Sequence, residues 1–140
     1  MTAAATEALI RRYYAAFNAG DSVGMLACLA VEVRHDVNQG GTRRGRAAFA
    51  EFCAHMARCY RERLEDIVVM IAPDGRRAAA EFIVHGTYIA TDEGLPLATG
   101  QTYVLPAGTF FEIEGGLIAR ITTCYNLRRW LELVGAAAPA

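Results

Sequence analysis

The stretch RRAAAEFIVHGTYIA, residues 76–90, predicts a long β-strand. Its second half alternates, and a strand directs successive side chains to opposite sides of its sheet. One side carries Phe82, Val84, Gly86 and Tyr88, and the other carries Glu81, Ile83, His85 and Thr87. The fold then depends on which elements surround this strand.

The surrounding second half of the chain is also rich in strand patterns, separated by turn-forming residues. It begins with a strand at 64–72 (LEDIVVMIA), the turn Pro73-Asp74-Gly75, the strand at 76–90 and a loop at 91–100. Two strand pieces within 102–114, bent near Pro106 and Gly108, follow. A turn at 114–116, a strand at 117–126 and a short helix at 126–135 come last.

The first half is mainly helical. It reads as a helix over 6–21 capped by Thr6, a shorter helix to Leu29 capped by Asp21 or Ser22, a strand at 31–37 (VEVRHDV), a loop at 38–45 and a helix at 46–63. Helices first and antiparallel strands afterwards predict an α+β fold. We expect one domain over residues 1–140, in which a cone-shaped, curved antiparallel or mixed sheet carries the N-terminal helices on its concave face. Such a cone encloses a cavity suited to a small hydrophobic molecule.

Composition excludes several classes of function. With 140 residues, 54% of them hydrophobic, and a net charge of −1, the chain can form one core and is a poor partner for nucleic acid or an anionic membrane. All fourteen basic residues are arginine, which excludes lysine chemistry, and Ser22 is the only serine, which argues against a Ser-His-Asp hydrolase. We find no signal peptide and no membrane-spanning stretch, so we expect a cytoplasmic protein.

The four cysteines, Cys28, Cys53, Cys59 and Cys124, match no zinc-binding spacing and no CxxC pair. His55 and Cys59 are four residues apart, on one face of a predicted helix, and could hold half of a metal site. The sequence shows no second pair to complete it. We therefore expect no metal and no organic cofactor, and cysteines that are reduced and packed as small apolar groups.

Two segments resemble known families. RYYAAFNAGD, residues 12–21, resembles the first helix of the ketosteroid isomerases, and residues 86–135 resemble the SnoaL-like polyketide cyclases. Both belong to the nuclear transport factor 2-like superfamily, and HDVNQGG (35–41) and YNLRRW (125–130) make the chain most similar to ketosteroid isomerase-related proteins. The resemblance implies the cone fold and a homodimer.

The resemblance carries over only part of a catalytic set. Tyr13 matches the isomerase's tyrosine that binds the enolate oxygen. The isomerase's second acid would fall at Thr109 and its base at Val37, and the cyclase aspartate would fall close to Asn126. The family register also turns the Phe82–Tyr88 side of the long strand toward the cavity and His85 away from it.

His35 and Asp36 are the candidate proton acceptors. An imidazole titrates near neutral pH, which suits proton transfer. Adjacent residues of a strand point to opposite faces, so both reach one substrate only if the strand carries a bulge. The alternative is a buried, structural His35 with Asp36 outside in an arginine pair. Tyr13, helped by Asn38, would steady the enolate.

These residues lead to two hypotheses about function. The first is acid–base isomerisation or aldol-type cyclisation of a hydrophobic carbonyl compound, steroid-like or polyketide-like. The alternative is a non-catalytic module of the same fold that binds a hydrophobic ligand. An epoxide hydrolase ranks last, because Asp36 is the only buried acid that the sequence places convincingly. The residues expected to line the ligand site are Phe17, Asn38, Val84, Tyr88, Tyr103, Phe111, Thr123 and Tyr125.

Overall fold

The computed structural model describes residues 2–135, which form four helices and six strands. In chain order the elements are α1 (Ala3–Asn18), α2 (Ser22–Ala27), β1 (Leu29–Val37), β2 (Thr42–Arg44), α3 (Arg46–Cys59), β3 (Tyr60–Ile71), β4 (Arg77–Tyr88), β5 (Thr102–Glu114), β6 (Leu117–Tyr125) and α4 (Leu127–Gly135).

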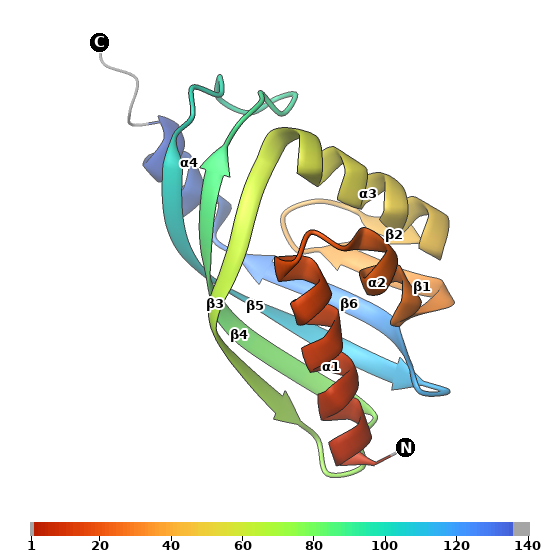
Figure 1. Cartoon of the computed structure of the whole chain (residues 1–140). Helices are drawn as coiled ribbons and strands as arrows, with labels where there is room; N and C mark the ends of the chain where they lie inside the picture. Colours follow the sequence, from red (N-terminus) through yellow and green to blue (C-terminus); the bar gives the residue numbers. More distant parts are fainter. Residues whose placement is uncertain (1, 136–140) are drawn as a thin grey trace.

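The six strands form one curved sheet in the order β2-β1-β6-β5-β4-β3. All neighbouring strands are antiparallel except β1 and β6, which are both interior strands and run parallel. The sheet bends around α1 and α3, and α4 lies at the end of the sheet where β4 leads into the 90–100 loop (Figure 1). The predicted α+β cone is therefore confirmed, with a mixed sheet.

The register of β4 confirms the two faces predicted from its alternation. Phe82, Val84 and Tyr88 are buried on the concave side, whereas Glu81 is exposed and His85 is half-buried on the outer side. On the neighbouring strand β3 the pairing shifts between Glu65 and Val68, around Asp66, whose φ is 54°. Such a bulge bends an edge strand and increases its twist.

Several predicted boundaries differ from the structure. The helix expected to reach residue 63 ends at Cys59, and β3 begins at Tyr60. The 102–114 segment is one continuous strand and not two pieces. Its pairing with β6 begins only at Ala107, so Pro106, which has no amide hydrogen, interrupts no hydrogen bond to β6. Three residues of the expected 38–45 loop form β2, as the range above shows.

The cap of the first helix was also predicted wrongly. Thr2 caps α1 by accepting a hydrogen bond from the Ala5 amide, whereas Thr6 is fully buried and donates its hydroxyl to the Gly75 carbonyl at 2.6 Å. Thr6 thereby ties α1 to the turn between β3 and β4. The predicted Asp21 cap of α2 is present, with the Gly24 amide as donor.

An aromatic cluster fills the concave side beneath α1. Tyr14 packs its ring 5.4 Å from Phe82 and 6.1 Å from Phe111, and Tyr13 lies 5.2 Å from Tyr14. Phe111 and Ile121 are essentially inaccessible to solvent. This half of the cone is therefore a packed core, and any accessible interior lies toward α3 and α4.

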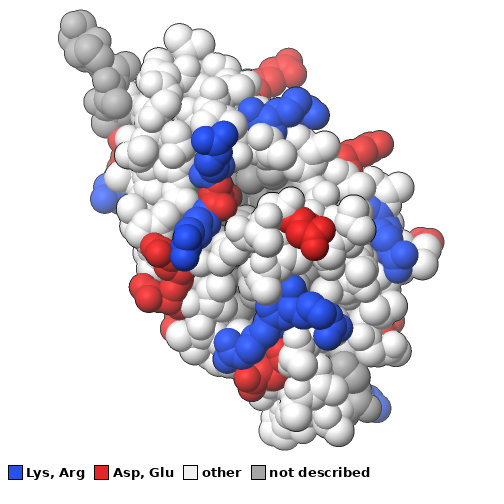
Figure 2. Space-filling view, in the orientation of Figure 1, with Lys and Arg blue, Asp and Glu red and all other residues white. Residues whose placement is uncertain are grey.

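Basic and acidic groups are interspersed on the face seen in Figure 2, with large uncharged areas between them. No helix within residues 2–135 combines the length and apolar character needed to cross a bilayer.

Candidate active site

His35 faces the interior, as β1 places it opposite Ile121 of β6. Its side chain is buried between Phe49 and Phe52, with ring centroids 5.0 and 4.6 Å away, and Nδ1 has no hydrogen-bond partner. Burial, aided by the nearby Arg43 charge, lowers the pKa of His35 to about 4. The imidazole is therefore neutral at neutral pH, and a base this weak is poorly matched to proton abstraction there.

Asp36 lies on the outer face of the sheet, on the side opposite to His35. Its carboxylate accepts hydrogen bonds from Thr42 (2.8 Å), Thr122 (2.9 Å) and Arg34 (3.1 Å). Pairing with β6 runs without a shift from Arg34 to Val37, so no bulge brings Asp36 and His35 together. Asp36 belongs to a surface ion pair, which was the alternative reading of the sequence.

Tyr13 is buried on α1 and keeps its proton. Burial raises its pKa well above the ordinary value, and the neighbouring Tyr14, Cys53 and Cys28 side chains act in the same direction. The phenol can donate a hydrogen bond, as the enolate hypothesis requires. His35 Nδ1 does not accept that bond, because this atom has no hydrogen-bond partner in residues 2–135.

The predicted ligand-lining residues separate into three groups. Tyr88 and Phe111 are fully buried and belong to the core, as do Val84 and Tyr103, which are nearly so. Asn38 lies beyond the end of β1 and is exposed, outside the interior. Phe17, Thr123 and Tyr125 are half-buried, and the register of β6 turns Thr123 and Tyr125 toward the concave face.

The solvent-accessible part of the concave side lies between the second half of α3, the start of β3 and the end of β6. Several of the side chains that face inward there are only half-buried, whereas the aromatic cluster beneath α1 is buried. The half-buried group comprises Phe52, Cys53, Tyr60, Glu62, Ala107, Thr123 and Tyr125.

Glu62 is the acidic residue of this region that the sequence analysis missed. On β3 it lies opposite Gly86, on the same inward side as Leu64. Its Oε2 accepts a hydrogen bond of 2.5 Å from the Tyr103 hydroxyl. Burial raises the pKa of Glu62, and the bond from Tyr103 partly opposes this rise. A half-buried carboxylate with a raised pKa is a typical general base.

Gly86 makes the Glu62–Tyr103 pair possible. A Cβ atom at position 86 would lie 2.2 Å from Cζ of Tyr103, so only glycine leaves room for the phenol ring. The ring also meets Trp130 of α4 edge-on, with 5.9 Å between centroids. The phenol is therefore held on two sides and fixes the Glu62 carboxylate.

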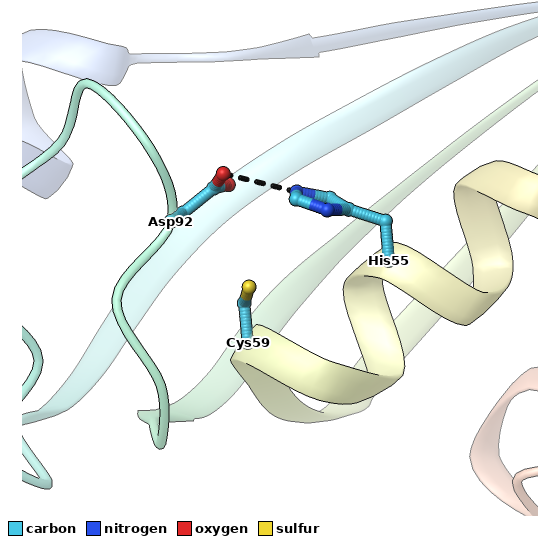
Figure 3. A group of neighbouring side chains, drawn as sticks. All are labelled: His55, Cys59 and Asp92. Atoms are coloured by element: carbon cyan, nitrogen blue, oxygen red, sulfur yellow. Dashed lines mark ion pairs between the residues drawn. The ribbon is translucent and has the colours of Figure 1, made fainter.

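A second polar group lies at the same end of the molecule. Figure 3 shows His55 on α3 and Asp92 in the 90–100 loop pointing toward each other, with 3.0 Å between Nε2 and Oδ1. The Tyr60 hydroxyl donates to the other Asp92 oxygen at 2.7 Å. Burial raises the pKa of Tyr125, and the charges of Glu62 and Asp92 act in the same direction.

Sequence reasoning missed Glu62 because the expected helix over 46–63 included it. The signal was present: alternation back from Leu64 places residue 62 on the same face. Asp92 could not be found in this way, because only the path of the 90–100 loop brings it to α3.

Two surface hollows of about 370 and 380 Å³ lie away from these residues, near the β5–β6 hairpin and on the outer face of the sheet. Charged residues line both, so neither is the apolar cavity that the sequence predicts. They include Arg76, Glu112 and Glu114 in the first, and Glu32, Arg34, Arg44 and Arg120 in the second.

Comparison with known proteins supports the fold and the resemblance. The family model described as SnoaL-like domain matches residues 10–121. A candidate polyketide cyclase from Pseudomonas putida KT2440 shares 63% identity, with a TM-score of 0.91 over 96% of this chain and 98% of that one. No curated protein matches the chain.

Two further solved structures carry the same description. The candidate polyketide cyclase from Silicibacter sp. TM1040 is 54% identical, with a TM-score of 0.92 over 96% of this chain and 98% of that one. The one from Xanthomonas campestris pv. campestris is 53% identical, with a TM-score of 0.90 over 92% and 96%. A Burkholderia pseudomallei protein of NTF2-like fold, 20% identical with a TM-score of 0.76, shares the fold.

Proposed function

The chain belongs to the SnoaL-like domain family, and on this premise we propose that it catalyses acid–base rearrangement of a small apolar carbonyl compound. The reaction would be an isomerisation or an aldol-type cyclisation, in which a proton leaves the carbon next to the carbonyl group. The description of three close relatives as candidate polyketide cyclases supports a polyketide-like substrate.

The observation that carries this proposal is the inward-facing Glu62 carboxylate. It is the acid on the accessible concave side whose pKa is raised, and proton transfer is most efficient when the pKa of the base approaches the working pH. The 2.5 Å bond from Tyr103 occupies one carboxylate oxygen and leaves the other free to accept a substrate proton.

Tyr125 supports the second half of the reaction. Abstraction of the proton places negative charge on the carbonyl oxygen, and a neutral donor in a poorly solvated site stabilises that charge. The Tyr125 phenol keeps its proton, because burial and the nearby Glu62 raise its pKa. Phe52 and Cys53 of α3 are half-buried and would offer apolar surface to the substrate. Tyr13 and His35 lie deeper and would shape the inner end of the site.

Hydrogen–deuterium exchange tests this proposal without knowledge of the product. The full chain is incubated in D₂O with a panel of ketosteroids and linear polyketide-like ketones, and loss of the α-proton signal is followed by NMR. We expect Glu62→Gln to slow exchange by about 10² to 10⁴-fold, the usual contribution of a general base. Glu65→Gln is the matched control, since Glu65 is on the same strand but pairs with His85 on the outer side.

Two results would contradict the proposal. In the first, Glu62→Gln exchanges the α-proton as fast as the wild type and His35→Gln exchanges it more slowly. The base would then be His35, and the reaction would take place deeper in the fold. If the panel binds, as seen in thermal shift, and no compound exchanges, the chain is a binding module for a hydrophobic ligand.

We also propose that the chain is a homodimer that pairs through the outer face of its sheet. Superfamily resemblance suggests this arrangement, and four large apolar side chains on that face support it. They are Val68, Met70, Val104 and Phe110, each about half exposed.

A further inference from the structure

Three side chains with different ligand atoms meet where α3 ends. The donor atoms of His55, Cys59 and Asp92 all lie within 4.8 Å of one another, and no other such group of three occurs in the described part of the chain. Figure 3 shows all three directed into the space between α3 and the 90–100 loop. Asp92 supplies the partner that the His55–Cys59 pair lacks in the sequence.

The surrounding structure fixes each of these groups in place. The Ile89 and Ala90 amides both donate to the Cys59 carbonyl, at 2.9 and 3.3 Å, which ties the end of α3 to the chain entering the loop. Cys59 Sγ lies 4.0 Å from the carbonyl oxygen of Thr91, the residue before Asp92. The three groups therefore sit on hydrogen-bonded backbone rather than on a free loop tip.

Two tyrosines hold Asp92, one at its carboxylate and one at its backbone amide. Tyr60 donates to Oδ2 at 2.7 Å, which leaves Oδ1 directed at His55, and the Asp92 amide donates to the Tyr88 hydroxyl at 2.9 Å. Tyr60 and Tyr88 are stacked with 5.4 Å between ring centroids, and Trp130 packs against both. Outer-shell hydrogen bonds of this kind are what hold metal ligands in position.

Burial of the three groups is graded. Cys59 is 5% exposed, and the side chains of Asp92 and His55 are 19% and 38% exposed. The Cys59 thiol therefore lies at the bottom and the His55 imidazole at the solvent-exposed rim. One sulfur, one nitrogen and one oxygen ligand with an open fourth position is the donor set that suits tetrahedral Zn²⁺.

We propose that His55, Cys59 and Asp92 bind one Zn²⁺ ion, with a water molecule or a ligand oxygen at the fourth position. Binding would replace the His55–Asp92 contact. It would release the thiol proton of Cys59 and, where His55 is protonated, its imidazole proton to solvent, so affinity would rise with pH. The proposal does not depend on the proposed reaction, because metal binding is measured without substrate.

Cobalt substitution provides the direct test. The full chain, treated with a chelator and desalted, is titrated with Co²⁺ and then with Zn²⁺. We expect one equivalent of Co²⁺ to give a thiolate charge-transfer absorption together with the intense visible bands of a tetrahedral site, and Zn²⁺ to abolish both. Cys59→Ser should remove the charge-transfer absorption, and His55→Ala or Asp92→Asn should weaken Zn²⁺ binding by more than about 100-fold.

Matched controls separate this site from adventitious binding. His85→Ala removes an imidazole that pairs with Glu65 at 2.7 Å on the outer face, and Cys124→Ser removes another half-buried thiol. Neither change should affect the Co²⁺ spectrum. Tyr60→Phe, which removes only the outer-shell bond to Asp92, should weaken binding about 10- to 100-fold.

The proposal is overturned if the wild-type chain gives no charge-transfer absorption, or if the absorption survives in Cys59→Ser and is lost in Cys124→Ser. Because Cys59 is buried, each variant's fold is checked by circular dichroism. The exposed His55→Ala variant decides the matter if Cys59→Ser does not fold. In that case, if His55→Ala binds Zn²⁺ as tightly as the wild type, the ion does not bind at these three groups. They would then be only an ion pair and a buried thiol.

Discussion

Acidification should destabilise the fold through His35, and replacement of this residue by leucine should remove much of that sensitivity. The pKa of His35 is about 4 in the folded chain, against 6.5 for an unperturbed histidine. Because the unfolded chain binds the proton more tightly, stability is retained above about pH 6.5 and lost as the pH falls toward 4. At 1.36 kcal/mol for each unit of pKa, this difference is worth about 3 kcal/mol.

A loss of about 3 kcal/mol is a large part of the stability of a small domain, which is typically about 5–15 kcal/mol. In His35→Leu, the side chain still fills the space between Phe49 and Phe52, and the unpartnered Nδ1 is gone. We therefore expect His35→Leu to be no less stable than wild type at pH 7. At pH 4 it should be more stable, by about 3 kcal/mol beyond any difference at pH 7.

Urea unfolding followed by tryptophan fluorescence measures this prediction, since Trp130 is the only tryptophan and is buried. Free energies of unfolding are compared at several pH values between 4 and 7. Phe49→Leu is the control, because it loosens packing at the same place and should lower stability equally at every pH. A difference between His35→Leu and wild type that stays constant from pH 7 to pH 4 would refute the buried neutral imidazole.

Three further predictions concern other contacts. Gly86→Ala should destabilise the fold by about 1–3 kcal/mol and displace the Tyr103 ring, because the added methyl group overlaps it. Thermal unfolding and the intensity of tyrosine fluorescence would show this, and an unchanged melting temperature would contradict it. Thr6→Val should cost about 1–3 kcal/mol in chemical unfolding by leaving the buried Gly75 carbonyl without a donor, and a cost near zero would show that another group takes over. Phe110→Arg should convert the expected dimer into a monomer in sedimentation velocity, while a wild-type chain that is monomeric at micromolar concentration would remove the dimer altogether.

The sequence determined the fold class and the faces of the strands. The alternation in 76–90 fixed which side of β4 is buried, since one register shift would move every side chain to the other face. The same two-residue period placed His35 and Asp36 on opposite faces, and the structure agrees. Local spacing of this kind needs no knowledge of distant segments, which is why it was readable.

Only the tertiary structure decided which inward-facing side chains remain accessible to solvent. Helix α3 ends at Cys59 and not at residue 63, because Tyr60 joins β3 as the pairing partner of Tyr88, and this puts Glu62 on the concave face. The 90–100 loop brings Asp92 beside His55 and Cys59 across a separation that no local pattern encodes. Burial and proximity depend on how remote segments pack together, so the protonation of His35 and Glu62, and with it the chemistry available to each, follows from the packed molecule rather than from its residue order.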